Sequence, residues 1–393
     1  MEVERIMQFA ERLQSLPAHF FATLIAKLSE MQSEGLDVIR LDEGSPDMPP
    51  EHPIIQELAL SAENPANHSY QPHRGTAQLR QAWATMYQNA YGVELEAERE
   101  VLPLLGSKEG IFHIAMATIN PGDVVLVPDP GYITYTRGAL FAGGQVVYFP
   151  LSPELDYLPD FASIPAEIAR RAKILWLNYP NNPTTAVATP ALFTQAVEFV
   201  REYGILLCHD AAYTQVTFDD YHAPSLLEIP GAKDVAVEFN TLSKSHNMAG
   251  WRVGAALGNQ QALRALFSLK TNQDSGHFKP VLDAASAAMC GDQSWLSQRN
   301  AVYRQRRDVA IQALRKMGFM AELPIASIYI WSDIPKGWSS VDFAKAALES
   351  ALVSITPGTV FGQRGEGYMR LSLTAPVERI AEAMYRLERW LGK

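Results

Sequence analysis

Short apolar runs alternate with segments of helical periodicity through the middle of the chain, and this alternation limits the possible folds more than any other feature. The runs have the length and composition of buried strands and occupy residues 101–105, 123–128, 145–150, 173–180, 205–211, 235–239 and 252–258. Helix-like stretches lie between several of them, at 108–119, 132–142, 190–203 and 260–271. Near-continuous apolar strands separated by helices are typical of a mostly parallel sheet covered on both faces. The pattern therefore predicts an α/β fold.

The flanking sequence is organised differently. Residues 281–317 predict one long helix, and after it come a strand, a helix, a strand and a final helix, at 325–331, 341–352, 368–373 and from 377 onward. An apolar stripe marks one face of the last helix. We therefore expect three parts: an N-terminal segment (1–48) that joins a small domain, a large domain (49–280) with a mostly parallel mixed sheet between helices, and a smaller α+β domain (281–393).

Composition and charge exclude several classes of protein. The 33 Lys+Arg and 43 Asp+Glu residues give a net charge of -10, which opposes general binding to nucleic-acid phosphates. Two cysteines, Cys208 and Cys290, cannot build a disulfide framework or a four-ligand zinc site, and we expect no metal. The chain shows neither a membrane-length apolar run nor a signal-peptide pattern near Met1. We expect a cytoplasmic protein without membrane or nucleic-acid partners.

The segment T-L-S-K-S-H-N-M-A-G-W-R (241–252) follows one expected strand and precedes another. A lysine in such a turn, Lys244, can be desolvated, and a lysine with a depressed pKa forms Schiff bases with carbonyl compounds. The hydroxyl groups of Thr241 and Ser243, together with Arg252, could bind a phosphate. An ordinary surface lysine beside a helix cap is the competing interpretation.

Other polar residues also stand at the ends of expected strands. Asp210 could pair with a protonated ring nitrogen and Tyr213 could reach the same ligand, although a helix-capping aspartate is the simpler explanation. Asn182 lies in an Asn-Pro turn, which can be a plain tight turn. Ser107 opens a helix whose N-terminus can bind an anion, although a helix N-terminus without a ligand, capped by Ser107, is an equal alternative. Tyr132 could stack on a flat ligand or pack in the core. Together these residues match what pyridoxal phosphate requires.

The residues that carry these features also resemble a known family. The chain resembles the class I/II aminotransferases, pyridoxal-phosphate enzymes of fold type I, over nearly its full length. The resemblance rests on EGSPD (43–47), HSYQPHRGTAQLR (68–80), GSKEGI (106–111), NPGDVVLVPDPGY (120–132), NYPNNPT (178–184), HDAAY (209–213), SKSHNMAGWRVG (243–254) and YMRLSLT (368–374). GSKEGI, the segment ending in PDPGY, and KTNQDSG (270–276) look most like the LL-diaminopimelate aminotransferase-like branch.

The resemblance implies a role for each site residue. Lys244 would bind pyridoxal 5'-phosphate covalently and move the proton at the substrate Cα, while Asp210 would pair with the ring nitrogen. Asn182 and Tyr213 would hydrogen-bond the ring hydroxyl, and Tyr132 would stack on the ring. The expected phosphate ligands are Ser107, Lys108, Thr241, Ser243, Arg252 and, from the partner subunit of a homodimer, the residue at position Tyr70. Arg370 would bind the substrate α-carboxylate, with Gly44, Asn182 and His19 nearby.

Three positions depart from the family pattern. Thr185 stands where the family turn has glycine, so the turn after Asn182 is expected to differ in detail. His19 replaces a substrate-contacting tyrosine of the LL-diaminopimelate branch. His246 replaces another tyrosine, and we expect it to be a solvated loop histidine.

The expected reaction is transfer of an amino group from an amino acid to a 2-oxo acid such as 2-oxoglutarate, with LL-diaminopimelate or an aspartate/glutamate-type donor as candidates. A pyridoxal-phosphate C–S lyase or another amino-acid lyase on the same scaffold is the first alternative, because it would share the lysine, the acid and the carboxylate-binding arginine. A non-enzymatic regulatory relative is the second, and the presence of Lys244, Asp210 and Arg370 argues against it.

Overall fold

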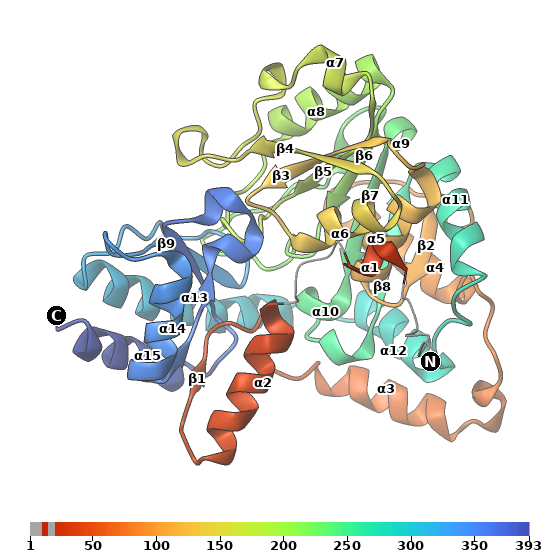
Figure 1. Ribbon diagram of the computed structural model, residues 1–393. Helices are drawn as coiled ribbons and strands as arrows, with labels where there is room; N and C mark the ends of the chain where they lie inside the picture. The colour runs from red at the N-terminus through yellow and green to blue at the C-terminus, as the bar shows by residue number, and fades with distance from the viewer. Residues whose placement is uncertain (1–9, 15–19, 393) are drawn as a thin grey trace, which may run out of the picture.

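A seven-stranded sheet forms the centre of the larger part of the molecule (Figure 1). The structure is a computed structural model that describes residues 10–14 and 20–392. The strands are β2 (Val101–Leu104), β3 (Val124–Asp129), β4 (Gln145–Pro150), β5 (Ala172–Asn178), β6 (Leu206–Asp210), β7 (Ala236–Thr241) and β8 (Gly254–Gly258). They lie in the order β2-β8-β7-β6-β5-β3-β4, and β8 alone runs in the direction opposite to the other six strands. The expected mostly parallel mixed sheet is confirmed.

The turn between β7 and β8 contains the lysine segment. β7 and β8 pair antiparallel, with Thr241 opposite Gly254. Between them the chain forms only the short helix α10 (Leu242–Ser245) and the 3-10 turn η5 (Ala249–Trp251). A parallel return would need a crossover, usually made by a full helix, and none is present in this connection. The hairpin-like connection therefore leaves Lys244 at the carboxyl end of β7, beside the carboxyl ends of β5 and β6.

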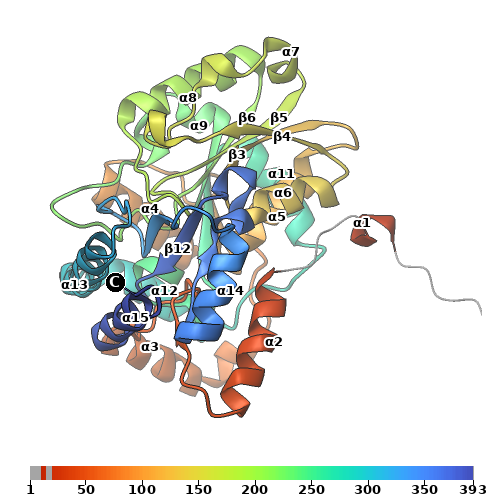
Figure 2. The ribbon, with the colours of Figure 1, turned by 60° about the vertical axis from the view of Figure 1, so that its left-hand side comes forward.

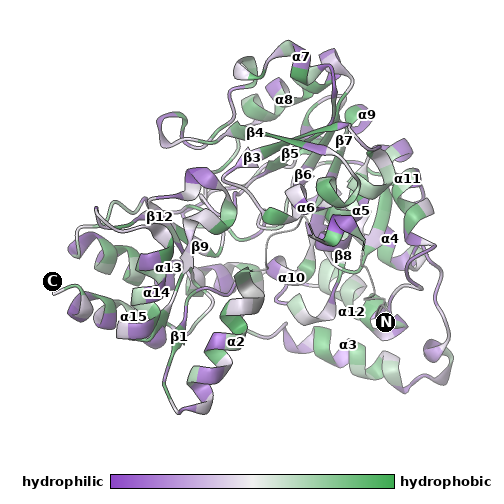
Figure 3. Cartoon of the chain, in the orientation of Figure 1, coloured by the Kyte–Doolittle hydropathy of each residue, from purple (hydrophilic) through white to green (hydrophobic). Residues whose placement is uncertain are grey.

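Helices cover both faces of the sheet, because neighbouring residues of a strand point to opposite sides. In β3, Val125 packs into a core with α5 (Ser107–Thr118), α6 (Ile133–Phe141) and α11 (Gln260–Lys270). Val124 instead packs into a core with α8 (Pro190–Tyr203). On that second side, α4 (Ala77–Tyr91) and α12 (Lys279–Cys290) cover β2 and β8. In Figure 3 the strands are mostly green and the outer helix surfaces carry much of the purple.

A second, smaller group of strands lies beside the large sheet (Figure 2). β9 (Tyr329–Asp333), β11 (Thr356–Pro357) and β12 (Tyr368–Ser372) form an antiparallel sheet, in the order β11-β12-β9. β1 (Ile39–Arg40) pairs in parallel with β10 (Val353–Ser354). Helices α13 (Trp295–Lys316), α14 (Ser340–Ala351) and α15 (Val377–Trp390) pack on these strands. The pairing of β1 with β10 joins the N-terminal region to this smaller part.

The prediction of one long helix over 281–317 is wrong. The structure has two helices, α12 ending at Cys290 and α13 beginning at Trp295. Gly291 has low helix propensity, and the carboxylate of Asp292 accepts hydrogen bonds from the backbone N–H and the hydroxyl of Ser294, at 2.8 and 2.7 Å. Such local side-chain hydrogen bonds offer the backbone an alternative to the helix. The break allows α12 to cover the large sheet while α13 packs on the smaller one.

The remaining helices are α1 (Glu11–Gln14), α2 (Phe20–Ser33), α3 (His52–Glu63), α7 (Ala166–Ala169) and α9 (Ala232–Val235), with 3-10 turns at Pro65–His68, Pro153–Leu155, Phe161–Ser163, Leu226–Glu228, Gly358–Phe361 and Gln363–Gly365. Among the residues that the structure describes, no helix has both the length and the apolar composition needed to cross a membrane.

Candidate active site

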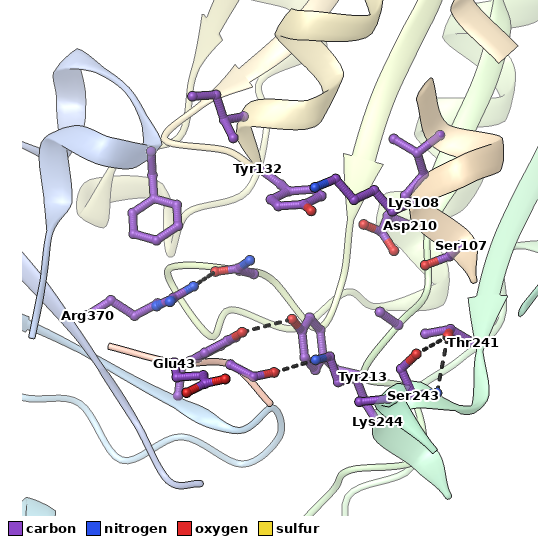
Figure 4. A pocket seen from close by; sticks show the side chains of 18 of the residues that line it. Glu43, Ser107, Lys108, Tyr132, Asp210, Tyr213, Thr241, Ser243, Lys244 and Arg370 are labelled. Carbon is purple, nitrogen blue, oxygen red and sulfur yellow. Dashed lines mark hydrogen bonds between the residues drawn. The ribbon is translucent and has the colours of Figure 1, made fainter. Parts of the chain in front are cut away.

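A cavity of about 360 Å³ lies between the carboxyl edge of the large sheet and the strands of the smaller one (Figure 4). This is the edge at which open α/β sheets bind ligands. The predicted site residues that line it are Gly44, Ser107, Lys108, Tyr132, Asn182, Asp210, Tyr213, Thr241, Ser243, Lys244, Arg252 and Arg370. Residues from distant parts of the sequence thus meet in one cavity, as the strand-end argument predicted.

Of the predicted residues that the structure describes, Tyr70 does not line the cavity. Tyr70 is 90% exposed on the surface of this chain, and its expected contact would need a second subunit. His19 lies outside the described residues, so its predicted contact with substrate stays a prediction.

Lys244 occupies α10, immediately after β7. The hydroxyl oxygen of Thr241 accepts a hydrogen bond from the backbone N–H of Ser243 at 3.1 Å, which caps this short helix. The Lys244 amine donates a hydrogen bond to the carbonyl oxygen of Gly44. Burial lowers the pKa of Lys244; Arg370 and Arg252 lower it further, while Tyr329 and Asp210 act in the opposite direction. The amine therefore loses its proton more easily than that of an exposed lysine, as a nucleophile or base requires.

An anion-binding cradle surrounds the N-terminus of α5. Helix α5 begins at Ser107, where its first backbone N–H groups have no partner within the helix. The Arg252 guanidinium lies 3.4 Å from the Ser243 hydroxyl and 3.4 Å from the Leu105 carbonyl oxygen. Gly106 makes this approach possible, because a Cβ there would lie 2.2 Å from the guanidinium. Hydroxyl groups, a guanidinium and a helix N-terminus are the donors that bind phosphate.

Asp210 ends β6 and is only 6% exposed. One carboxylate oxygen, Oδ2, accepts a hydrogen bond from the Tyr135 hydroxyl at 2.9 Å. The other, Oδ1, is buried and has no hydrogen-bond partner. Burial raises the pKa of Asp210 to about 6, against the lowering effect of the Tyr135 hydrogen bond. A buried acceptor without a partner is costly, and a protonated ring nitrogen in the cavity would satisfy it. This orphan oxygen fits the pyridine ring of pyridoxal phosphate.

Arg370 enters the cavity from β12. It is 3% exposed, while its neighbours Met369 and Leu371 pack in the small core, as strand alternation predicted. Its guanidinium donates hydrogen bonds to the Asn182 side-chain oxygen at 2.8 Å and to the Asp42 carbonyl oxygen at 2.9 Å. Within residues 10–14 and 20–392, no carboxylate side chain forms an ion pair with it. A buried guanidinium that has no carboxylate partner within the protein is suited to bind the carboxylate of a ligand.

Aromatic rings that sequence reasoning missed complete the walls. The Arg370 guanidinium lies 4.0 Å from the ring centre of Tyr329 and 4.7 Å from that of Phe361. Tyr329 also lies within 3.2 Å of Tyr213, hydroxyl to hydroxyl. Tyr135 was missed as the partner of Asp210, although its spacing of three residues from Tyr132 on a helix was a signal that both could face the site.

His246 is not a solvated loop residue, so that expectation is wrong. It is fully buried, with Nδ1 2.8 Å from the Ser245 hydroxyl and Nε2 3.1 Å from the Gln293 side-chain oxygen. Burial, reinforced by Arg299, lowers its pKa to about 4. Ser245 is its neighbour in α10, whereas Gln293 lies in the break between α12 and α13, which the prediction of a single helix did not include.

The surrounding structure accommodates Thr185 in its turn and gives the buried His209 a polar partner. Thr185 adopts φ 64°, so the turn keeps the left-handed backbone that glycine would favour, at some cost in strain. His209 Nδ1 lies 2.8 Å from a carboxylate oxygen of Glu238, and both side chains are buried. No group of three or more metal-binding side chains capable of holding an ion occurs in the part of the chain that the structure describes.

Comparisons with known proteins agree with this geometry. The sequence profile of the family described as aminotransferase class I and II matches residues 36–387. The LL-diaminopimelate aminotransferase of Moorella thermoacetica is 47% identical over 387 residues, covering 98% of this chain and 99% of that protein. The enzyme of that name from Aquifex aeolicus is 42% identical over 383 residues, covering 98% and 99%.

Solved structures show the same fold. The substrate-bound BacF structure from Bacillus subtilis superposes with a TM-score of 0.94 at 35% identity, covering 98% of each chain. The aromatic aminotransferase from Pyrococcus horikoshii OT3 superposes with a TM-score of 0.86 at 27% identity, covering 93% of this chain and 98% of that one.

Proposed function

The chain belongs to the class I and II aminotransferases, pyridoxal 5'-phosphate enzymes that move an amino group from an amino acid to a 2-oxo acid, and we propose that the residues of the cavity carry out this transfer. The orphan oxygen of Asp210 is the observation that carries the assignment of the site, because it fits a ring-nitrogen donor. When bound, the cofactor supplies a carbonyl that takes up the amino group and a protonated ring that accepts the electron pair from the substrate Cα.

Three sets of side chains hold the cofactor in this proposal. Asp210 pairs with the ring nitrogen and keeps it protonated, and Tyr132 stacks on the ring. Asn182 and Tyr213 reach the ring hydroxyl. The phosphate is bound by the cradle residues, which are Ser107, Thr241, Ser243 and Arg252 together with the N-terminus of α5.

Lys244 both anchors the cofactor and moves the proton. Its amine lies at the carboxyl end of β7, in the cavity that Asp210 and Arg370 also line. Because its pKa is lowered by burial, the free amine can accept the proton from the substrate Cα. The cofactor would supply the carbon to which Lys244 then delivers this proton. The carbonyl of Gly44 accepts a hydrogen bond from this amine and so orients it within the cavity.

Arg370 binds the α-carboxylate that every amino-acid and 2-oxo-acid substrate shares. Replacing it with alanine is expected to lower kcat/KM at least tenfold for all substrates, since a charge-assisted contact contributes about 1.5–3 kcal/mol. Lysine should restore only part of the loss, because it lacks the planar fork. Arg40→Ala is the matched control: Arg40 lines the same cavity but pairs with Asp42 and Glu43. A fall in kcat/KM of less than threefold for all substrates in the Arg370→Ala enzyme would contradict the role of Arg370 in binding the α-carboxylate.

For the amino donor we propose LL-diaminopimelate, because the relatives reported above carry the name LL-diaminopimelate aminotransferase. Lys108 provides independent support, because a donor with a second carboxylate needs a second cation. Lys108 lines the cavity and forms no ion pair with a described residue. Figure 4 shows its amine beside Tyr132, on the opposite side from Thr241 and Ser243 of the cradle. Its sequence-based assignment to the phosphate is the competing role.

The Lys108→Met enzyme separates these two roles. If Lys108 binds the distal carboxylate, kcat/KM should fall about tenfold or more for LL-diaminopimelate, aspartate and glutamate and stay near the wild-type value for alanine. Steady-state assays with each donor and 2-oxoglutarate measure this. An equal loss for every donor, accompanied by faster loss of the cofactor, would assign Lys108 to the phosphate.

A half-reaction tests the transfer itself. Each donor is added to the cofactor-loaded enzyme without an oxo acid, and conversion of the cofactor to its amine form is followed by absorbance. A stoichiometric change with LL-diaminopimelate, reversed by 2-oxoglutarate, is expected. Release of pyruvate and ammonia from a donor with a leaving group at Cβ, without that change, would instead indicate a lyase.

We further propose that the enzyme is a homodimer in which Tyr70 of one chain reaches the cofactor phosphate that the other chain binds. Its 90% exposure in a single chain supports this, as does the exposed aromatic Phe278, whose ring lies 5.2 Å from that of His68. Mixing a Tyr70→Phe chain with an inactive Lys244→Ala chain tests it. In a heterodimer the intact lysine belongs to the Tyr70→Phe chain and receives Tyr70 from its partner, so activity should rise above that of either parent.

A further inference from the structure

Arg299 is a buried cation without an acidic partner. It lies on α13, is 4% exposed, and forms no ion pair with any carboxylate in the described part of the chain. Burial lowers its pKa to about 10, so it remains charged at neutral pH. Removing a charge from water without a counter-charge is costly, and the contacts that compensate this cost show what the side chain does.

All of its N–H donors reach oxygen atoms of two loops or of its own helix. Nη1 donates to the carbonyl oxygens of Lys244, at 2.7 Å, and of Ser245. Nη2 donates to the carbonyl oxygen of Gln215 at 2.7 Å. The remaining donors bind the side-chain oxygen of Asn300, at 2.7 Å from Nη2 and 3.1 Å from Nε. The planar fork thus spans the end of α10 and the turn that follows Asp210.

These carbonyl groups belong to the two segments that carry the reactive side chains. Helix α10 is four residues long, so its last carbonyl groups have no partner within it. Gln215 lies two residues after Tyr213, in the turn that leaves β6. One guanidinium therefore fixes the backbone of Lys244 relative to the segment that carries Asp210 and Tyr213.

Two other buried arginines of the same helix do not share this arrangement. Arg306 pairs with Asp47 at 2.7 Å, and Arg307 pairs with Asp219 and Asp308. Both charges are balanced by acids, whereas that of Arg299 is balanced by backbone carbonyls of the lysine loop. Arg307 is 2% exposed, and its hydrogen bonds go to Asp308, Asp219 and the carbonyl oxygen of Pro324. None of these bonds reaches the carbonyl groups that Arg299 binds, so Arg307 is a matched control.

We propose that Arg299 is a positioning residue for Lys244, which holds the lysine backbone so that the amine meets the cofactor and the substrate Cα at productive distances. The inference rests on the proposed role of Lys244. Arg299 itself touches neither ligand, since it is absent from the residues that line the cavity. Its effect should therefore appear in the reactions of the Lys244 amine and not in substrate binding.

The test compares Arg299→Gln, Arg299→Lys and the control Arg307→Gln. The first readout uses apoenzyme: the rate of covalent capture of pyridoxal 5'-phosphate, followed by absorbance. We expect Arg299→Gln to slow capture and lower kcat about 10- to 100-fold, with KM within twofold, because small misplacements of a reacting group have effects of this size. Arg299→Lys should be intermediate, since it keeps the charge but cannot span both loops. Arg307→Gln should match wild type in both rates.

Thermal unfolding of each variant separates positioning from loss of fold. If Arg299→Gln does not fold, Arg299→Lys decides alone. Capture and kcat within twofold of wild type in the folded Arg299 variants would overturn the inference, as would the same slowing in Arg307→Gln. The Lys244→Ala variant shows which of the two proposals has failed. If it still captures the cofactor covalently, the proposed role of Lys244 is wrong. If it captures no cofactor while the Arg299 variants behave like wild type, only the positioning role of Arg299 is rejected.

Discussion

Replacing Lys244 with alanine is expected to abolish covalent capture of the cofactor and turnover together. No other described lysine combines the end of a sheet strand, a lowered pKa, and the neighbouring hydroxyls and guanidinium of the cradle. The same amine both forms the covalent bond and moves the proton, so alanine removes two contributions at once. The loss of the proton transfer alone is about 10²- to 10⁴-fold.

Borohydride reduction followed by mass measurement of peptides detects the covalent bond directly. Lys108→Met is a matched control, because Lys108 lines the same cavity but should leave the reducible adduct on Lys244. A Lys244→Ala enzyme that still yields a borohydride-reducible cofactor adduct would show that another lysine is the anchor. Added small amines should restore some turnover to the alanine variant, since they can move the proton without the side chain.

The sequence predicted which residues meet in the cavity, because strand ends are local features with a shared geometry. Asp210, Lys244 and Ser107 are far apart along the chain, yet each follows an apolar run. Parallel strands bring their carboxyl ends to one edge of a sheet, so recognising the strands was enough to bring these residues together. Arg370 was placed by the alternation of β12, in which Met369 and Leu371 face the core.

Contacts that depend on tertiary packing were not predictable in this way. His246 is polar and lies in a turn, so solvent exposure was expected; its burial depends on Gln293, in the break between α12 and α13. Arg299 looks like one of several basic residues on a long helix. Its orientation toward the carbonyls of Lys244 and Ser245 follows from how α13 crosses the lysine loop, and no local pattern encodes that crossing.

The second large effect is expected at Asp210. Asp210→Ala should still bind the cofactor but lose most of its activity, because the ion pair with the ring nitrogen stabilises charge that develops as the Cα proton leaves. Breaking a buried charge pair typically costs about 3–5 kcal/mol, and the lower figure already corresponds to about a hundredfold in kcat. The loss should therefore fall on kcat, with a smaller change in KM. Stopped-flow measurement of the half-reaction isolates this step from product release.

Two further variants show whether charge or shape is responsible. Asp210→Asn keeps the size of the side chain and can still accept the hydrogen bond that Tyr135 donates at 2.9 Å, yet it lacks the negative charge; it should be nearly as slow as alanine. Tyr135→Phe keeps the charge and the stacking on Trp176, whose ring centre lies 4.7 Å away, but removes the hydrogen bond to Oδ2. It should cost about 1.5–3 kcal/mol, the worth of a hydrogen bond to a charged group, and so less than the loss of the charge itself. Near-normal kcat in Asp210→Asn would remove Asp210 from the role of ring partner. A loss in Tyr135→Phe as large as that in Asp210→Asn would show that the orientation of the carboxylate, and not its charge alone, sets the rate.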